Sequence, residues 1–169
     1  MESAPGFEEF AATRTRRLFQ VAHLMCGDWH QAQDLVQTTL AKMYAAWPRL
    51  RRGEDEPGLD AYARTVLLRT YLSQRRLRRS SEVVLAEVPD SPLHSGPGSD
   101  LRLTLAAALG QLPPRNRAVV VLRYLEDHSI EAVADMMGMS AGAVKSLNTR
   151  SLAKLRTILG DDRELLFRL

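Results

Sequence analysis

The stretch SIEAVADMMGMSAGAVKSLNTRSLAKLR, residues 129–156, decides how the C-terminal part of the chain folds. Ser129 precedes a run in which apolar residues recur at i, i+3, i+4 and i+7, the spacing of one face of an α-helix. Gly138 interrupts this pattern, and Ser140 is suited to cap a second helix. A capped helix, a short turn and a second capped helix together predict a helix-turn-helix unit.

The second helix of this unit, residues 141–156, has two faces of different chemistry. At about 100° per residue, its apolar side chains gather mainly on one side, which is expected to pack on the core. The other side combines cations with small hydrogen-bonding groups, which suit phosphates and base edges in the DNA major groove. This face is predicted to contact duplex DNA through Lys145, Ser146, Thr149, Arg150 and Arg156.

The basic face of this helix has a second interpretation, which is a solvated surface without a ligand. For an isolated helix with four cations, that interpretation would be favoured. The capped helix and tight turn that precede it favour DNA contact instead. Asn148 projects toward the apolar side, so it is either a buried hydrogen-bonding residue or a sign that the helix is rotated from this assignment.

Charge is distributed along the 169 residues in three blocks, although the net charge is only +3. Residues 1–79 carry 13 basic and 9 acidic side chains, residues 80–100 carry 4 acidic and no basic ones, and residues 101–169 carry 10 basic and 7 acidic ones. The acidic segment is rich in Ser, Pro and Gly, which is typical of a flexible linker. We therefore predict a domain at 1–79, a linker at 80–100, a domain at 101–160 and a C-terminal tail at 161–169.

Apolar residues recur at helical spacing on both sides of this linker, and no sustained alternating run indicates a β-strand. The fold is therefore predicted to be all-α, with two small helical domains. In the first domain, Gly27 is suited to a left-handed helix end, and Asp28 with Gln31 resembles a capping box. Pro48 is expected to end the second helix, and a third helix is expected from about residue 59 to residue 79.

Two further helices are expected at the start of the second domain. Residues 103–112 have helical periodicity, and residues 113–127 form a second periodic run. Pro113 and Pro114 are suited to the first turn of the latter helix, where the missing amide hydrogen is tolerated.

The third helix, which contains AYARTVLLRTYLSQRRLRR at 61–79, is rich in arginine and has no acidic residue between its arginines. Arg64, Arg75 and Arg79 lie within about 60° of one another around the axis, so they could follow a phosphate backbone. Tyr62 and Tyr71 supply aromatic faces of the kind that unstacked bases require. The alternative is that the tyrosines belong to the core and the arginines are solvated, and for Tyr62 alone this alternative is favoured.

Three segments of the chain together resemble a known family. DLVQTTLAKMYAAW at 34–47, the arginine-rich segment at 61–79 and LPPRNRAVVVLRYLEDHSIEAVADMMGMSAGAVKSLNTRSLAKLR at 112–156 resemble the extracytoplasmic-function (ECF) sigma factors of bacterial RNA polymerase, and most closely the short actinobacterial type. The resemblance implies a protein that binds core polymerase, recognises promoters and takes part in strand opening. It implies no enzymatic activity of the chain itself and no cofactor.

The same resemblance implies roles for individual residues. Asp34, Leu35, Val36 and Gln37 match the segment that binds the polymerase clamp, and Asp34 and Gln37 are the members expected to contact it. Residues 51–59 and the start of the helix that follows them match the part that captures a flipped base of the minus-ten element. The helix-turn-helix face named above matches the residues that read the minus-thirty-five element. Together with the arginine-rich helix, the resemblance assigns the minus-ten element to Arg64, Arg69, Thr70, Tyr71, Arg75, Arg76 and Arg79.

The partners implied by the resemblance are core RNA polymerase, through its clamp and flap regions, and promoter DNA. An anti-sigma factor is a further candidate partner. No segment approaches the length of a membrane span, and the single cysteine, Cys26, fits a reducing compartment, so a cytoplasmic protein without a membrane partner is expected.

Two other kinds of protein were weighed against this expectation. A stand-alone helix-turn-helix regulator with an N-terminal effector or dimerisation domain explains the second domain but not the arginine-rich helix. A metal enzyme or metal-linked sensor is suggested by His23, Cys26 and His30. These three residues lack a fourth ligand or a nearby pair of carboxylates, so they indicate only a weak metal site, and no metal is expected.

Overall fold

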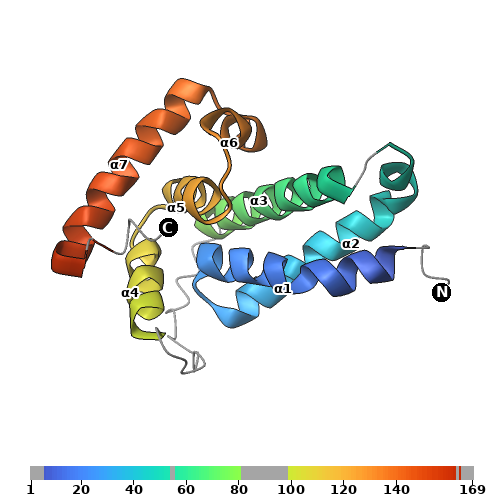
Figure 1. The fold of residues 1–169 in the computed structure, drawn as a ribbon, viewed down its shortest axis with the longest axis horizontal. Coiled ribbons are helices and arrows are strands. Elements are labelled where there is room, and N and C mark those ends of the chain that lie inside the picture. Colours follow the sequence, from blue (N-terminus) through green and yellow to red (C-terminus); the bar gives the residue numbers. More distant parts are fainter. Residues whose placement is uncertain (1–5, 54–55, 81–98, 163, 165–169) are drawn as a thin grey trace.

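The structure is a computed structural model that describes residues 6–53, 56–80, 99–162 and 164. Within these residues it contains α-helices and one π-helical turn and no β-strand, so the all-α prediction is confirmed (Figure 1). The predicted linker at 80–100 and the tail at 161–169 fall largely outside the described residues. The elements are α1 (Phe7–Cys26), α2 (Trp29–Gly53), α3 (Glu56–Ser80), α4 (Ser99–Gly110), α5 (Pro114–Val120), η1 (Val121–Leu125), α6 (Ile130–Met137) and α7 (Ala141–Leu159).

The first domain is a bundle of α1, α2 and α3, in which each helix runs back alongside the one before it (Figure 1). Its core is formed by apolar side chains that recur along one face of each helix, such as Met25, Leu35 and Leu68, all of which are fully buried. The Arg14 Nε atom lies 2.7 Å from Asp60 Oδ1, and this ion pair joins α1 to α3. Burial of the three apolar faces accounts for the bundle.

Local capping chemistry sets the turn between α1 and α2 as predicted. Gly27 has a φ of 72°, in the left-handed region that glycine adopts without strain, and its amide donates to the carbonyl of His23. Asp28 Oδ1 accepts a hydrogen bond of 2.8 Å from the amide of Gln31. The carboxylate of Asp28 therefore satisfies one of the free amides at the start of α2.

The prediction that Pro48 ends the second helix is wrong. Helix α2 continues to Gly53 with Pro48 inside it. A proline within a helix costs about 3 kcal/mol, because it removes an amide donor and crowds the preceding turn. Trp47 and Leu50 on either side of the proline are both buried in the core. Burying side chains of this size contributes about 1.5–3 kcal/mol each, so packing outweighs the local penalty.

The helix-turn-helix unit forms as the serine positions predict. Ser129 Oγ accepts a hydrogen bond of 3.0 Å from the amide of Ala132 at the start of α6, and Ser140 Oγ accepts one of 3.1 Å from Ala143 at the start of α7. Gly138 ends α6 with a φ of 63°. Each serine thus satisfies an amide that the helix itself leaves unpaired.

The run predicted as one helix at 113–127 divides into α5 and the π-helical turn η1. At the end of η1 the amide of Glu126 donates to the carbonyl of Val121 at 3.0 Å, which is the wider hydrogen-bonding pattern of a π-helix. Asp127 follows with a φ of 55°. Helical periodicity predicted that this run is helical, but it does not distinguish a π-helical turn from an α-helical one.

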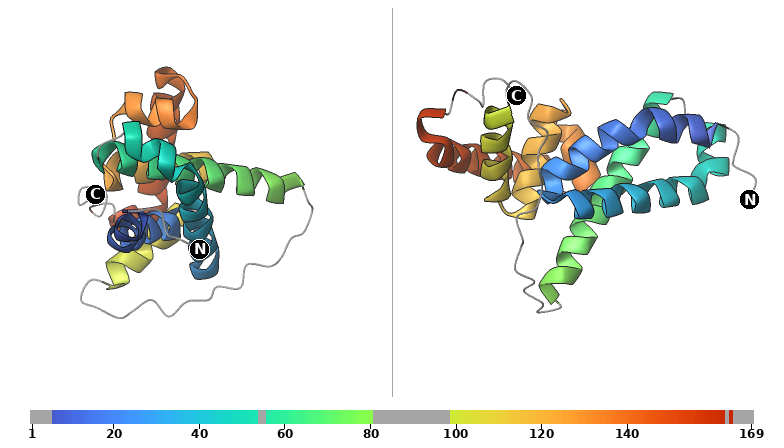
Figure 2. Two further views of the ribbon diagram at one scale, coloured as in Figure 1. Left: turned by 90° about the vertical axis from the view of Figure 1, so that its right-hand side faces the viewer. Right: turned by 90° about the horizontal axis from the view of Figure 1, so that it is seen from below.

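The second domain packs against the end of the bundle where α1 finishes (Figure 2). Arg117 forms hydrogen bonds to both domains at this contact. Arg117 is only 5% exposed. Its Nε donates to the carbonyl of Leu109 at 2.7 Å, and its Nη1 donates to the carbonyl of Met25. Both carbonyls lie in the last turns of helices, where partial negative charge stabilises a buried cation. A Cβ atom at Gly110 would lie 3.0 Å from Arg117 Nη2, so this close approach depends on glycine.

Replacing Arg117 with Ala is expected to lower the free energy of unfolding by about 2–4 kcal/mol, because buried carbonyls at two helix ends lose their donor. Urea-induced loss of helical circular dichroism measures the effect. Arg115→Ala, at an exposed position of the same helix, is the control and is expected to change stability by less than about 0.5 kcal/mol. Equal stability of the two variants would show that Arg117 does not hold the domains together.

Candidate nucleic-acid interface

Helix α7 presents the polar face that its sequence predicts. Val144, Ser151 and Leu155 are buried against the rest of the second domain. The opposite side of the helix is open to solvent over its length, and the exposed residues include Lys145, Ser146, Thr149, Arg150 and Arg156. One accessible surface of α7 therefore carries three cations and two hydroxyl groups. An α-helix fits into the major groove of DNA, so this surface can reach phosphates and base edges there.

A hydrogen bond of Asn148 shows how α7 is rotated about its axis. The Nδ2 of Asn148 donates a hydrogen bond of 3.0 Å to the hydroxyl of Tyr124, which lies in η1. Asn148 is therefore a partly buried hydrogen-bonding residue, and the helix is not rotated from the predicted assignment. Lys154, at the edge of the exposed face, donates to the carbonyl of Gln111 at 3.0 Å and holds α7 to the loop before α5.

Helix α3 exposes only some of the arginines that were predicted to bind an unpaired strand. Arg69, Ser73 and Arg76 are exposed, and helical geometry places them within about 60° of one another. Tyr62 lies on the same side, half-buried where it packs on the core. This side of α3 therefore has two exposed arginines, a hydroxyl and the edge of an aromatic residue, and Arg78 is exposed on another side.

Thr70 and Tyr71, which were predicted to contact the minus-ten element, are buried rather than exposed on the surface of α3. Thr70 is 4% exposed and Tyr71 is 2% exposed. The Nζ of Lys42 donates to the Thr70 hydroxyl at 2.9 Å, and burial raises the pKa of the Tyr71 hydroxyl. In this arrangement neither residue offers a surface to a DNA strand. Ala63, Leu67 and Tyr71 recur every four residues, and this spacing indicated a core position for Tyr71.

Arg75 of the arginine-rich helix joins α3 to the C-terminal end of α1 within the first domain. Its guanidinium lies 5.7 Å from the centre of the Tyr71 ring, and its Nη2 donates to the carbonyl of Cys26 at 3.4 Å. Burial raises the pKa of the Cys26 thiol to about 11, even though nearby arginines act in the opposite direction. Arg79 lies in α3, but its side chain is outside the described part of the structure.

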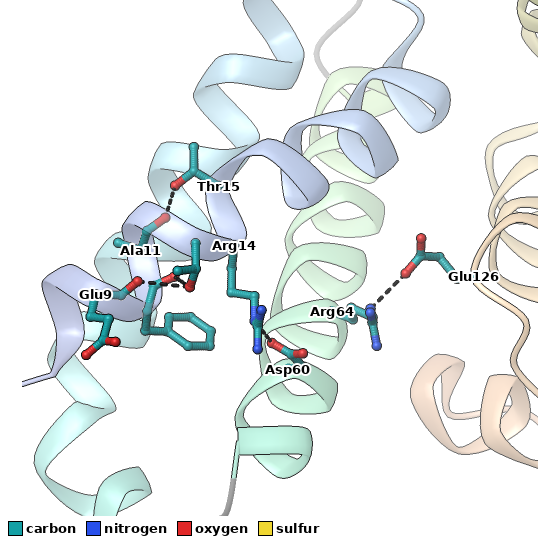
Figure 3. A network of polar contacts seen from close by, with 9 residues as sticks. Glu9, Ala11, Arg14, Thr15, Asp60, Arg64 and Glu126 are labelled. Atoms are coloured by element: carbon teal, nitrogen blue, oxygen red, sulfur yellow. Dashed lines mark hydrogen bonds and ion pairs between the residues drawn. The ribbon is translucent and has the colours of Figure 1, made fainter.

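Arg64 pairs with an acidic residue of the second domain that sequence patterns did not single out. The Arg64 Nε atom lies 2.8 Å from Glu126 Oε2 (Figure 3). The Nη2 of Arg17 lies 3.1 Å from Glu126 Oε1. The Glu126 side chain is 4% exposed. Next to it, burial lowers the pKa of His128 below its usual value of 6.5. The two arginines and Glu126 come from α1, α3 and the turn after η1, so only the tertiary fold brings them together.

The predicted polymerase-binding segment lies on α2 and divides between surface and core. Leu35 and Val36 are buried, whereas Asp34 and Gln37 are exposed on the outer side of the bundle. The segment predicted to capture a flipped base begins in the last turn of α2, and its residues 54–55 lie outside the described part.

The residues weighed as metal ligands have other surroundings. His23 stacks on Phe19 and meets the ring of Trp29 edge-on. Among the residues that the structure describes, no group of three histidine, cysteine or acidic side chains is placed to hold a metal ion. None of the helices in the described ranges is both long and apolar enough to cross a membrane.

Comparisons with known proteins match both domains. The family model described as Sigma-70 region 2 matches residues 10–81, and that described as Sigma-70, region 4 matches residues 108–157. The RNA polymerase sigma-E factor of Streptomyces coelicolor is 40% identical over 151 residues, which cover 89% of this chain and 84% of that protein. The ECF RNA polymerase sigma factor SigE of Mycolicibacterium smegmatis is 29% identical, over 92% of this chain and 62% of that protein.

A solved structure agrees with these relatives. The sigma factor RpoE from Bartonella quintana, in its complex with the anti-sigma factor NepR, has 27% sequence identity and a TM-score of 0.75, and the match covers 95% of this chain and 100% of that one. The two matched regions occur in the same order as the bundle and the helix-turn-helix domain described above. The chain therefore belongs to the ECF sigma factors, which direct RNA polymerase to promoters and initiate transcription.

Proposed function

We propose that this sigma factor reads the minus-thirty-five element with α7 and holds an unpaired strand of the minus-ten element on α3. The exposed face of α7 carries the proposal, because it combines cations and hydroxyl groups on a helix whose opposite face is buried. On α3, the exposed Arg69 and Arg76 are suited to the phosphates of a strand, with Tyr62 beside them.

Core polymerase is the partner that would make these two surfaces act together. We infer that Asp34 and Gln37 contact the polymerase clamp and that the second domain contacts the flap. Once the enzyme fixes the spacing of the two domains, the second DNA contact becomes intramolecular and is strengthened without any new interaction. The protein would then act in the cytoplasm, where the enzyme and the promoters are found.

An anti-sigma factor is proposed as a further partner. Two structures with the same fold are complexes of a sigma factor with such an inhibitor: one contains RpoE and NepR, and the other contains CnrH and the cytosolic domain of CnrY. The match to RpoE covers 95% of this chain, and this coverage of both domains supports an inhibitor as a partner of the same fold here.

A stand-alone regulator remains the alternative that a direct measurement separates from this proposal. A regulator would bind its duplex site tightly without polymerase, whereas a sigma factor gains specific binding when the enzyme is added. Electrophoretic mobility shifts of promoter fragments, with and without core polymerase, distinguish the two. Specific high-affinity binding by the chain alone would favour the regulator.

Charge reversal of Asp34 to Lys is expected to weaken binding to core polymerase by about tenfold, because an exposed carboxylate in the contact becomes a cation. Affinity is measured by fluorescence polarisation of the labelled chain, and circular dichroism checks that helical content is unchanged. Asp161→Lys makes the same charge change at an exposed position after α7 and is the control. Equal affinities of the two variants would place the clamp contact elsewhere.

Replacing Arg150 with Ala is expected to cost about 1–3 kcal/mol of binding at the cognate upstream element if the guanidinium contacts a base. Holoenzyme affinity is compared on cognate and altered elements. Arg115→Ala removes an exposed cation from α5 of the same domain, outside the face of α7, and is the control. An equal loss on all sequences would instead identify Arg150 as a phosphate contact, and no loss would remove it from the interface.

The double variant Arg69→Ala, Arg76→Ala is expected to reduce open-complex formation on duplex promoters by roughly tenfold, because two contacts to a separated strand are lost. Permanganate reactivity of promoter thymines and run-off yield measure the effect. A template already unpaired near the start site should restore much of the yield. The control removes two exposed arginines elsewhere, Arg16 and Arg115. Normal melting by the test variant would contradict the assignment of α3.

A further inference from the structure

Three aromatic rings lie together on the surface where α1 ends and α2 begins. The Trp29 ring, in the first turn of α2, meets the Phe19 ring of α1 edge-on, with 4.5 Å between the ring centres. The His23 ring stacks on Phe19 at 5.9 Å and lies 6.3 Å from the ring of Trp29. Trp29 is nevertheless 39% exposed, and it is one of two large apolar residues that are exposed in the described part of the chain. Its ring is therefore held by packing and is open to a partner.

This aromatic cluster carries no charge at neutral pH. Burial lowers the pKa of His23 below its usual value of 6.5, and this effect exceeds that of the Asp28 carboxylate, which acts in the opposite direction. The imidazole therefore adds to the apolar surface. Rings that already pack on one another lose little conformational freedom when a partner covers them, and such preorganised aromatic residues are typical anchors of protein interfaces.

The exposed side of α2 connects Trp29 to the residues proposed to contact the polymerase clamp. At about 100° per residue, Trp29, Gln33 and Gln37 lie within about 80° of one another around the helix axis. Asp34 lies within about 60° of Gln37 on the same side. All four residues are exposed. Trp29 and the proposed clamp contact therefore belong to one continuous surface.

The charge of this surface differs from that of the DNA-binding faces. The exposed sides of α3 and α7 are built on arginine and lysine, whereas residues 29–41 contain neither. A surface with a carboxylate and no cation does not attract the phosphates of DNA. It fits a protein surface with apolar groups and arginines, because an arginine can pair with a carboxylate and stack on an indole ring.

We propose that Trp29, supported by Phe19 and His23, is an aromatic anchor of the contact with core polymerase and extends the clamp-binding surface to the turn between α1 and α2. This inference rests on the proposed function of Asp34 and Gln37. Leu35 and Val36 between them are buried in the bundle, so residues 34–37 offer the partner polar groups alone. Trp29 supplies the apolar surface that this part of the contact otherwise lacks.

The first test locates the contact on the unaltered chain. Hydroxyl-radical footprinting read by mass spectrometry compares the oxidation rate of Trp29 in the free chain and in the presence of saturating core polymerase. Binding is expected to slow the oxidation of Trp29 by about fivefold or more, because the core of a protein interface excludes water. The same measurement on the chain alone, at increasing concentration, shows whether a second copy covers the ring.

The second test measures how much Trp29 contributes to affinity. Trp29→Ala is expected to bind core polymerase about 30-fold more weakly than the wild type, as followed by fluorescence polarisation of the labelled chain. Trp29→Phe keeps a ring against Phe19 and should retain most of the affinity. Leu77→Ala removes the other exposed large apolar side chain, which is 65% exposed on α3, and is the matched control. Thermal melting followed by circular dichroism checks that all three variants are folded.

The outcomes separate this inference from the proposed function. If Trp29 is not protected by core polymerase, or if Trp29→Ala binds as tightly as Leu77→Ala, the anchor is overturned, and the proposed function still stands when Asp34→Lys weakens binding. Protection of Trp29 in the concentrated chain alone also overturns the inference, because a second copy is then the occupant. If Trp29 is protected and required but Asp34→Lys binds normally, the anchor stands and the clamp contact proposed for Asp34 fails.

Discussion

One buried guanidinium group, that of Arg117, holds the two halves of the molecule together. It lies against the carbonyls of Met25 and Leu109, where the partial negative charges of two helix ends offset the loss of water around the cation. One carbonyl belongs to the first domain and the other to the second. Arg117 therefore satisfies both only when the domains are packed, and the placement of α5, η1 and the helix-turn-helix unit follows from this contact.

The other polar contacts at and near the junction also use arginines. Arg75 donates to the carbonyl of Cys26 within the bundle, and Glu126 of the second domain receives two arginines from the bundle. The Cys26 thiol and the Tyr71 hydroxyl lie beneath this layer, and burial keeps both neutral by raising their pKa values. A protein that binds a polyanion is rich in cationic side chains. At the junction, some of these arginines stabilise the fold by donating hydrogen bonds to carbonyl and carboxylate groups. The same residue type therefore serves the fold and the DNA contact.

The two DNA-binding surfaces differ in how they are made. On α7, the exposed cations and hydroxyl groups alternate with a buried apolar stripe, so one helix supplies the whole surface. On α3, arginines surround the helix, and contacts with other elements decide which of them stay available. Arg69 and Arg76 remain exposed, whereas Arg64 pairs with Glu126 of the second domain and Arg75 donates to a carbonyl of α1. The first surface suits an intact groove, and the second suits a strand that is presented only after melting.

The sequence by itself determined the features that depend on neighbouring residues. The all-α fold, the serine caps of α6 and α7 and the left-handed end at Gly27 follow from periodicity and capping chemistry within a few positions. The exposed face of α7 could be predicted for the same reason, because the helical period decides which residues lie opposite the apolar face.

Tertiary structure alone decided the features that join distant parts of the chain. Pro48 stays inside α2 because residues beside it are anchored in a core built by other helices, and Tyr71 is buried by the elements around α3. The pairing of Arg64 with Glu126 likewise depends on how the two domains pack. Local patterns report the charge and spacing of a residue, but burial and partner choice depend on surfaces that the chain brings together only on folding.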